Sequence, residues 1–178
     1  QAGRSTVDGT LTANGQLFLI NEKGIAFGAG ADVRAANFVA SGLGVSADLV
    51  RDGLFAQDVY KRAFYLNPTL AAATPDEAES AAASARDAFA QASVTVAPGA
   101  RIATNGDNGF VMLFGSRISQ GGTITTANGQ TLLAAGADIY LKAPFAAGLR
   151  GFMAEVNPLL FAVKATDVTP TQWSALDH

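Results

Sequence analysis

The sequence predicts a mainly β fold, a parallel β-helix that carries an inserted α-helical segment around residues 57–92. The first observation is the pentapeptide Thr-Ala-Asn-Gly-Gln, which occurs at residues 12–16 and again at residues 126–130. The second is a repeated unit of Gly, a small residue, a charged residue and a β-branched residue. Its four copies begin at Gly30, Gly99, Gly115 and Gly136. The last three copies follow one another closely, and a repeat of about 20 residues holds three short strands, which is one coil of a parallel β-helix.

Each copy of the pentapeptide lies between two short strand signals. Residues 9–12 and 17–20 flank the first copy, and residues 122–125 and 131–134 flank the second. In a β-helix the Asn-Gly pair forms the turn between two strands of one coil. The alternative is an antiparallel sandwich, because Asn-Gly is also the strongest hairpin signal. The phased recurrence of the Gly-small-charged-β-branched unit favours the β-helix, since hairpins do not require it.

Residues 47–92 differ in sequence pattern from the two β-rich blocks, because their period is helical, and they are interpreted as a helical insertion. Thr74, Pro75 and Glu77 match a helix start. Thr74 supplies a hydroxyl N-cap, Pro75 takes the first helical position, and the Glu77 side chain can bond the backbone N–H of the N-cap residue. We therefore expect a helix from Pro75 to about Ala92. Its apolar stripe is mostly alanine, so it can lie close against a sheet while burying little area per residue.

Three weaker signals complete the chain. Residues 57–66 predict a shorter helix that Asn67-Pro68 ends. Residues 152–156 read as a strand, and residues 169–173 as another small capping signature. We place no domain boundary, because the second β block needs the first as its neighbour. Residues 1–178 are thus expected to form a single β-helix domain that belongs to a longer protein.

The composition excludes several classes of function. Among 178 residues there are twelve Lys and Arg against fifteen Asp and Glu, which gives a net charge of −3. The chain therefore lacks the excess of basic residues that is typical of nucleic-acid binding. There is no Cys, and the single histidine is His178, the last residue. This excludes disulfides, thiolate nucleophiles, Ser-His-Asp triads and Cys or His metal clusters. We expect no catalytic residue, no cofactor and no metal site.

Carboxylates are the remaining catalytic candidates. Asp32 and Asp138 occupy the charged position of the repeated unit, and Arg101 and Arg117 occupy it in the other copies. One interpretation is a stacked acidic and basic cleft that binds sugar. The other, which we favour, is a solvated ladder in which Arg117 and Asp138 lie one coil apart and offset each other's charge.

Two further candidates have a functional and a structural interpretation each. Asp107 lies in an oxygen-rich stretch, Asn105-Gly106-Asp107-Asn108-Gly109, which hints at calcium but lacks the spacing and the terminal Glu of an EF-hand loop. A polar turn is the favoured interpretation. Tyr60, Phe64 and Tyr65 form either a sugar or partner contact or, as helical spacing more often indicates, part of the core.

The run from Val7 to Gly28 resembles the haemagglutination-activity, or two-partner secretion, domain of filamentous-haemagglutinin-like proteins. The runs 37–41, 109–113 and 124–141 are similar to coils of the same family. The resemblance covers about two thirds of the chain and leaves out the helical insertion. It implies a right-handed parallel β-helix that is exported through a dedicated outer-membrane partner pore.

One turn carries the expected secretion motif. The family reads Asn-Pro-Asn-Gly where this chain has Asn21-Glu22-Lys23-Gly24, so only Asn21 and Gly24 match. These two positions supply side-chain capping and a positive φ, so the turn geometry is expected to persist. The family's upstream Asn-Pro-Asn-Leu motif has no counterpart before Gln1, and we interpret the chain as the downstream part of such a domain.

The resemblance implies a secreted or cell-surface, outer-membrane-associated adhesin that is not an enzyme. Its expected partners are the transporter pore during export and then a host receptor or a glycan, or another copy bound through the ends of the β-helix. The first alternative is a self-assembling extracellular filament subunit, because cut coils expose unpaired strand edges. The second is a carbohydrate-active β-helix enzyme.

Overall fold

The protein is mainly β, with parallel sheets, in a computed structural model that describes residues 3–54, 63–66, 75–142 and 151–157. Three of its four sheets are entirely parallel. Sheet A contains β1 (Ser5–Val7), β4 (Ile25–Phe27), β9 (Ser93–Val96) and β12 (Arg117–Gln120). Sheet B contains β2 (Thr10–Thr12), β5 (Asp32–Ala35), β10 (Arg101–Thr104) and β13 (Thr123–Thr125). Sheet C contains β3 (Gln16–Ile20), β6 (Asn37–Ser41), β11 (Phe110–Gly115) and β14 (Gln130–Ala135).

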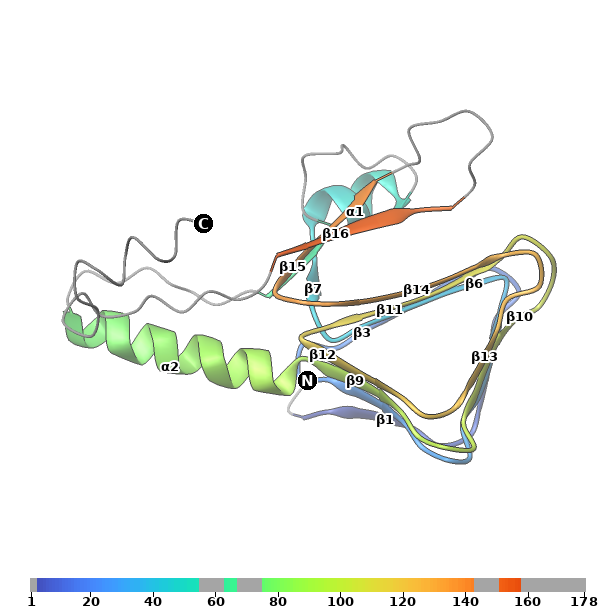
Figure 1. The fold of residues 1–178 in the computed structure, drawn as a ribbon, viewed down its shortest axis with the longest axis horizontal. Helices are drawn as coiled ribbons and strands as arrows, with labels where there is room; N and C mark the ends of the chain where they lie inside the picture. Colours follow the sequence, from blue (N-terminus) through green and yellow to red (C-terminus); the bar gives the residue numbers. More distant parts are fainter. Residues whose placement is uncertain (1–2, 55–62, 67–74, 143–150, 158–178) are drawn as a thin grey trace, which may run out of the picture.

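The chain passes through sheets A, B and C in that order four times, and we call each pass a circuit. Every strand pairs in parallel with the strand one circuit earlier or later. Ser5 of the first circuit lies beside Ile25 of the second, and Ser93 of the third lies beside Arg117 of the fourth. Viewed along the stacking direction, the three sheets enclose a triangle (Figure 1). The repeat of three short strands expected from the sequence is thus present as the circuit.

The two pentapeptides occupy the same corner of the triangle, between sheet B and sheet C. Residues 12–16 join β2 to β3 in the first circuit, and residues 126–130 join β13 to β14 in the fourth. The antiparallel hairpin alternative is wrong, because β2 pairs in parallel with β5 and β3 pairs in parallel with β6. The corner is tight. A Cβ on Gly129 would lie 1.8 Å from the carbonyl oxygen of Gly109 in the circuit before.

The four copies of the Gly-small-charged-β-branched unit are not equivalent, contrary to the expectation from the sequence. Asp32 and Arg101 are register partners in sheet B, but Arg117 pairs with Ser93 in sheet A. Asp138 lies in a fourth sheet. The physical reason is that the stretch from Gly99 to Gly115 begins before β10 and ends with β11, so it covers only part of a circuit.

Inside the triangle, one apolar core runs through all four circuits. Val33, Phe38, Ile102 and Val111 are fully buried there, and the rings of Phe27 and Phe38 meet edge to face at 5.9 Å. Edge-to-face packing is favourable for aromatic pairs beyond the area they bury. Because parallel stacking repeats the same inward positions in every circuit, each buried row continues from one circuit to the next.

An excursion leaves the triangle after the second circuit and returns before the third. It contains β7 (Gly44–Val45), α1 (Ala47–Asp52), β8 (Phe64–Tyr65) and α2 (Pro75–Gln91). The helix expected from Pro75 is confirmed. The shorter helix expected over residues 57–66 is wrong at Phe64 and Tyr65, which form a strand against β7 and β15. The rest of that expected helix up to residue 62, with Asn67-Pro68, lies outside the described residues.

Helix α2 projects from the corner of the triangle where sheet A meets sheet C (Figure 1). Among its described side chains, Ala88 and Phe89 toward its end pack against the core beside sheet C, and Ala85 is buried. The contact with sheet C is thus made toward the end of the helix.

The fourth sheet, sheet D, covers the outer face of sheet C (Figure 1). Its order is β16-β15-β8-β7, with β15 (Asp138–Lys142) and β16 (Met153–Asn157) paired antiparallel. The strand expected over residues 152–156 is thus confirmed with a shift of one residue. A second apolar core lies between sheets C and D, where the rings of Phe64 and Phe114 are 4.5 Å apart. The capping signature at residues 169–173 lies outside the described residues.

Candidate functional site

The turn that resembles the secretion motif joins β3 to β4, at the corner between sheet C and sheet A. Asn21 is buried, and its side-chain amide bonds in two directions. Its Nδ2 donates to the carbonyl oxygen of Gly3 at 2.9 Å and to Oγ of Ser5 at 2.8 Å. Its Oδ1 accepts from the backbone N–H of Lys23 at 2.9 Å. The side chain thereby ties the corner to the start of β1.

Gly24 closes the same turn with φ +90°, and its N–H donates to the carbonyl oxygen of Asn21 at 2.8 Å. A Cβ at this position would lie 2.5 Å from the carbonyl oxygen of Gln91 and 2.9 Å from that of Ser93. Glycine is required here both by the left-handed backbone and by the close approach of the end of α2.

The two residues that match the family motif are the buried ones, whereas Glu22 and Lys23 between them are exposed. A substitution at an exposed turn position is tolerated more easily than one at a packed position. The departure from the motif therefore falls where the turn geometry does not depend on the side chain. The Asn21 amide and the backbone groups of the turn hold its shape. Its role in secretion stays a prediction.

Asp32 and Arg34 form a two-point ion pair on the outside of sheet B. Nε and a terminal nitrogen of Arg34 each lie 3.0 Å from a carboxylate oxygen of Asp32. The hydrogen bond from Arg34 lowers the pKa of Asp32 below its usual value, and the positive charges of Arg34 and Arg101 act in the same direction. Asp32 is therefore an ionised partner of arginine at neutral pH.

The expected stacking of Arg117 on Asp138 is wrong. Arg117 lies on sheet A, whereas Asp138 pairs with Tyr65 and Asn157 in sheet D. The three aspartates considered for catalysis are also on separate elements. Asp32 lies on β5, Asp138 on β15, and Asp107 on the exposed turn after β10. In the part of the chain that the structure describes, no three His, Asp or Glu side chains are grouped to hold a metal ion.

Of the three aromatic residues considered for a ligand contact, two are described. Phe64 is fully buried and packs on Phe114, so it belongs to the core between sheets C and D. Tyr65 is half-buried beside it. Tyr60 lies outside the described residues.

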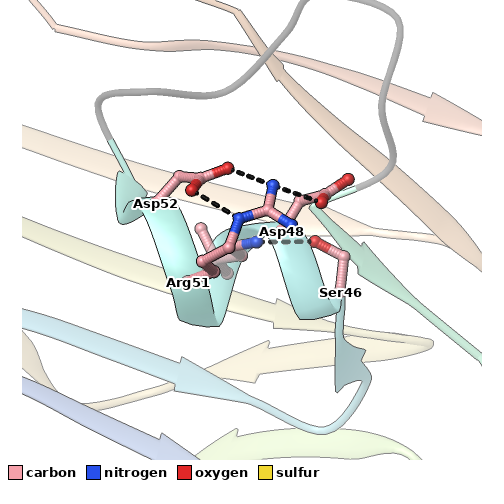
Figure 2. Close-up of polar contacts among 5 residues, drawn as sticks. Ser46, Asp48, Arg51 and Asp52 are labelled. Carbon is pink, nitrogen blue, oxygen red and sulfur yellow. Dashed lines mark hydrogen bonds and ion pairs between the residues drawn. The ribbon is translucent and has the colours of Figure 1, made fainter.

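Helix α1 is a feature that the sequence interpretation did not resolve within residues 47–92. Ser46 is its N-cap, and the Ser46 hydroxyl accepts from the N–H of Leu49 at 3.1 Å (Figure 2). Arg51 bonds Asp52 through two nitrogens and Asp48 through one, which raises the pKa of Arg51 (Figure 2). A serine followed by an acidic first turn was the available signal.

A second missed feature is a pocket of about 220 Å³ at the corner between sheets B and C. Three glycines line it together with Asn37, Asn108, Phe110, Asn128, Gln130 and Phe152. The residues come from three circuits and from the segment just before β16, so they meet only because the circuits stack in register. The second Asn-Gly-Gln sequence was a partial signal, because it supplies three of the lining residues.

Comparison with known proteins gives no assignment: no family model, no curated protein and no solved structure matches this chain. Among the described helices, none is long and apolar enough to cross a membrane.

Proposed function

We propose that this chain is a right-handed parallel β-helix of an exported bacterial surface protein of the filamentous-haemagglutinin type. It passes through an outer-membrane partner pore and then acts in adhesion at the cell surface, without catalysis. The observation that carries the proposal is the stacking of four circuits in parallel register, with Asn21 and Gly24 of the motif-like turn buried at the corner between circuits one and two.

The stacking supports the fold part of the proposal. Successive circuits pair residue for residue in sheets A, B and C, as expected when each coil of a solenoid completes the hydrogen bonds of its neighbour. Such a structure gains stability one coil at a time and needs no disulfide, which agrees with the absence of Cys. These traits suit a chain that crosses a pore and folds outside.

The distribution of carboxylates supports the absence of catalysis. Acid and base catalysis on a glycosidic bond requires two carboxyl groups about 5 to 9 Å apart, one of them with a raised pKa. Asp32 instead has a lowered pKa and a two-point arginine partner. The enzymatic alternative predicts release of reducing ends or unsaturated sugars from a polysaccharide panel, and we expect none.

Export is tested in source cells with an antibody raised against this chain. We expect labelling of intact cells, and loss of that labelling together with retention of the antigen in the periplasm when the gene for the partner pore is deleted. Antigen confined to the cytosol of wild-type cells would refute the proposal. So would unchanged surface labelling after deletion of every candidate pore.

The turn is tested in the same cells with Asn21→Ala, and Asn14→Ala is the matched control. Asn14 is an exposed corner residue of the first circuit and makes no side-chain hydrogen bond within the described residues. We expect surface antigen to fall several-fold with Asn21→Ala and to stay unchanged with Asn14→Ala. Protease resistance of the purified Asn21→Ala chain distinguishes a lost export signal from a lost fold.

A filament subunit is the second candidate, and the unpaired strand edges of the described circuits favour it. The outer edges of β1, β2 and β3, and of β12, β13 and β14, have no paired strand among the described residues. Along the inward row of sheet C, Ala40 and Leu113 are fully buried, whereas Leu133 in the last circuit is 42% exposed. Unpaired parallel edges with exposed core residues favour end-to-end pairing.

Light scattering and electron microscopy of the isolated chain test this candidate. Elongated assemblies that grow with concentration would support a filament. A strict monomer at high concentration would remove it and would leave the export proposal intact.

A further inference from the structure

The pocket between sheets B and C is built by the fold, because its walls are held by specific hydrogen bonds. The side-chain amide of Gln130 bonds both backbone groups of Phe152: Oε1 accepts from the N–H at 2.7 Å, and Nε2 donates to the carbonyl oxygen at 2.7 Å. This pairing fixes the residue before β16 against the fourth circuit. Gln130 is therefore a positioning residue, with its amide already engaged.

Two other amides remain able to bind a ligand. Asn37 uses Oδ1 to accept from the N–H of Phe110 at 3.0 Å, which leaves its NH₂ group without a hydrogen bond among the described residues. Asn128 is exposed and makes no side-chain hydrogen bond in the described part of the chain. Donor and acceptor groups of the asparagine type thus line the pocket from two different circuits.

An apolar wall completes the pocket. Phe110 and Phe152 meet edge to face, with ring centroids 6.0 Å apart and an interplanar angle of 76°. Phe110 is buried and Phe152 is half-buried, so the ring of Phe152 is the more accessible of the two. A ligand in this pocket would meet both amide groups and aromatic carbon.

Among the lining residues that the structure describes, none has an ionisable side chain. An anion or a cation would lose hydration here without gaining an opposite charge, which is unfavourable. A neutral sugar has both surfaces that the pocket offers: hydroxyl groups for the amides and a face of C–H groups for the rings. The volume is below the 300 to 1,000 Å³ of pockets for drug-sized ligands, so it suits one ring rather than a longer ligand.

We propose that this pocket binds a single neutral hexose unit of a glycan, with Asn128 and Asn37 on its hydroxyl groups and Phe152 against its apolar face. This supplies a ligand class for the proposed adhesin but depends only on the pocket. Failure of sugar binding would leave export untouched, because export is measured separately by surface labelling.

The test is NMR titration of the full chain with glucose, galactose, mannose and N-acetylglucosamine, and with glucuronate as the charged comparison. The signals to follow are the side-chain NH₂ groups of Asn128 and Asn37. A ligand of one ring is expected to bind with a Kd in the millimolar range. We expect saturable shifts with at least one neutral sugar and weaker binding of glucuronate.

Asn128→Gly is the decisive variant. Asn128 has φ +50°, so glycine removes the amide without straining the turn. Asn14→Gly is its control, because Asn14 has the same place in the other pentapeptide and does not line the pocket. We expect Asn128→Gly to weaken sugar binding at least tenfold and Asn14→Gly to leave it unchanged.

A third variant, Phe152→Leu, keeps an apolar side chain and removes the ring; it should also weaken binding. The proposal is overturned by any of three results: no shift with the four neutral sugars up to about 100 mM, equal binding by the Asn128→Gly and Asn14→Gly variants, or tighter binding of glucuronate than of glucose.

Discussion

Replacing Gly24 with alanine should destabilise the protein more than its small change in volume suggests. The residue has φ +90°, a conformation that costs a non-glycine residue about 1 to 2 kcal/mol. The added methyl group would also lie 2.5 Å from the carbonyl oxygen of Gln91 and 2.9 Å from that of Ser93, both backbone atoms. Relief of such overpacking typically costs about 1 to 3 kcal/mol. The two effects together predict a loss of about 2 to 5 kcal/mol.

Urea unfolding followed by circular dichroism measures this loss. With an m-value of about 2 kcal/mol per molar urea, the midpoint should fall by about 1 to 2.5 M. Gly15→Ala is the matched control, because Gly15 also lies in a corner of the first circuit but has no atom within 4 Å of the added Cβ and no positive φ. Its midpoint should move by less than about 0.3 M. A loss below about 1 kcal/mol for Gly24→Ala, or equal losses for both variants, would refute the reasoning.

Three further predictions concern other parts of the fold. Asn21→Ala removes two donated hydrogen bonds and one accepted hydrogen bond from a buried amide. In the same urea assay, the free energy of unfolding should fall by about 2 to 4 kcal/mol. The control Asn14→Ala should change it by less than about 0.5 kcal/mol. Phe114→Ala empties a fully buried position against Phe64 and should cost about 3 to 5 kcal/mol, measured by thermal melting, with exposed Val50→Ala as the control that should barely shift the midpoint. Arg34→Gln should raise the pKa of Asp32 toward its usual value of 3.8 in a carboxyl NMR titration. Because the folded-state pKa is lowered, the ion pair is complete above pH 3.8 and is lost as the pH falls through the lower folded value, and an unchanged titration in the variant would contradict the assignment.

Local sequence patterns predicted the parts of the fold that depend on near neighbours. The pentapeptide marked the corner between sheets B and C because Asn-Gly suits a tight turn wherever that turn lies. The helix from Pro75 followed from its start signals. Asn21 and Gly24 came from the resemblance to the secretion motif, and the turn geometry expected of them follows from local requirements, side-chain capping and positive φ.

Features that depend on register were beyond these patterns. Arg117 and Asp138 carry the same local signature as Asp32 and Arg101, but Arg101 and Arg117 lie less than one circuit apart and Asp138 follows the fourth circuit, so equal signatures do not fall on equal faces. Phe64 and Tyr65 form a strand because β7 and β15 lie on either side of them, and neither neighbour is near in sequence. The pocket has the same origin, because its asparagines and Phe152 meet only after the circuits have stacked.

The excursion between the second and third circuits leaves and re-enters the stack at nearly one point. The N–H of Gly42 donates to the carbonyl oxygen of Phe114, and a Cβ on Gly42 would lie 2.3 Å from the carbonyl oxygen of Ala92, where the chain returns. The join between circuits therefore has the same geometry whether the segment between its ends is short or long. Closing a tenfold longer loop costs only about 2 kcal/mol of chain entropy. The parts of the excursion that join its packed elements can consequently change in length at little cost, whereas Phe64 must be kept, because it fills the core between sheets C and D.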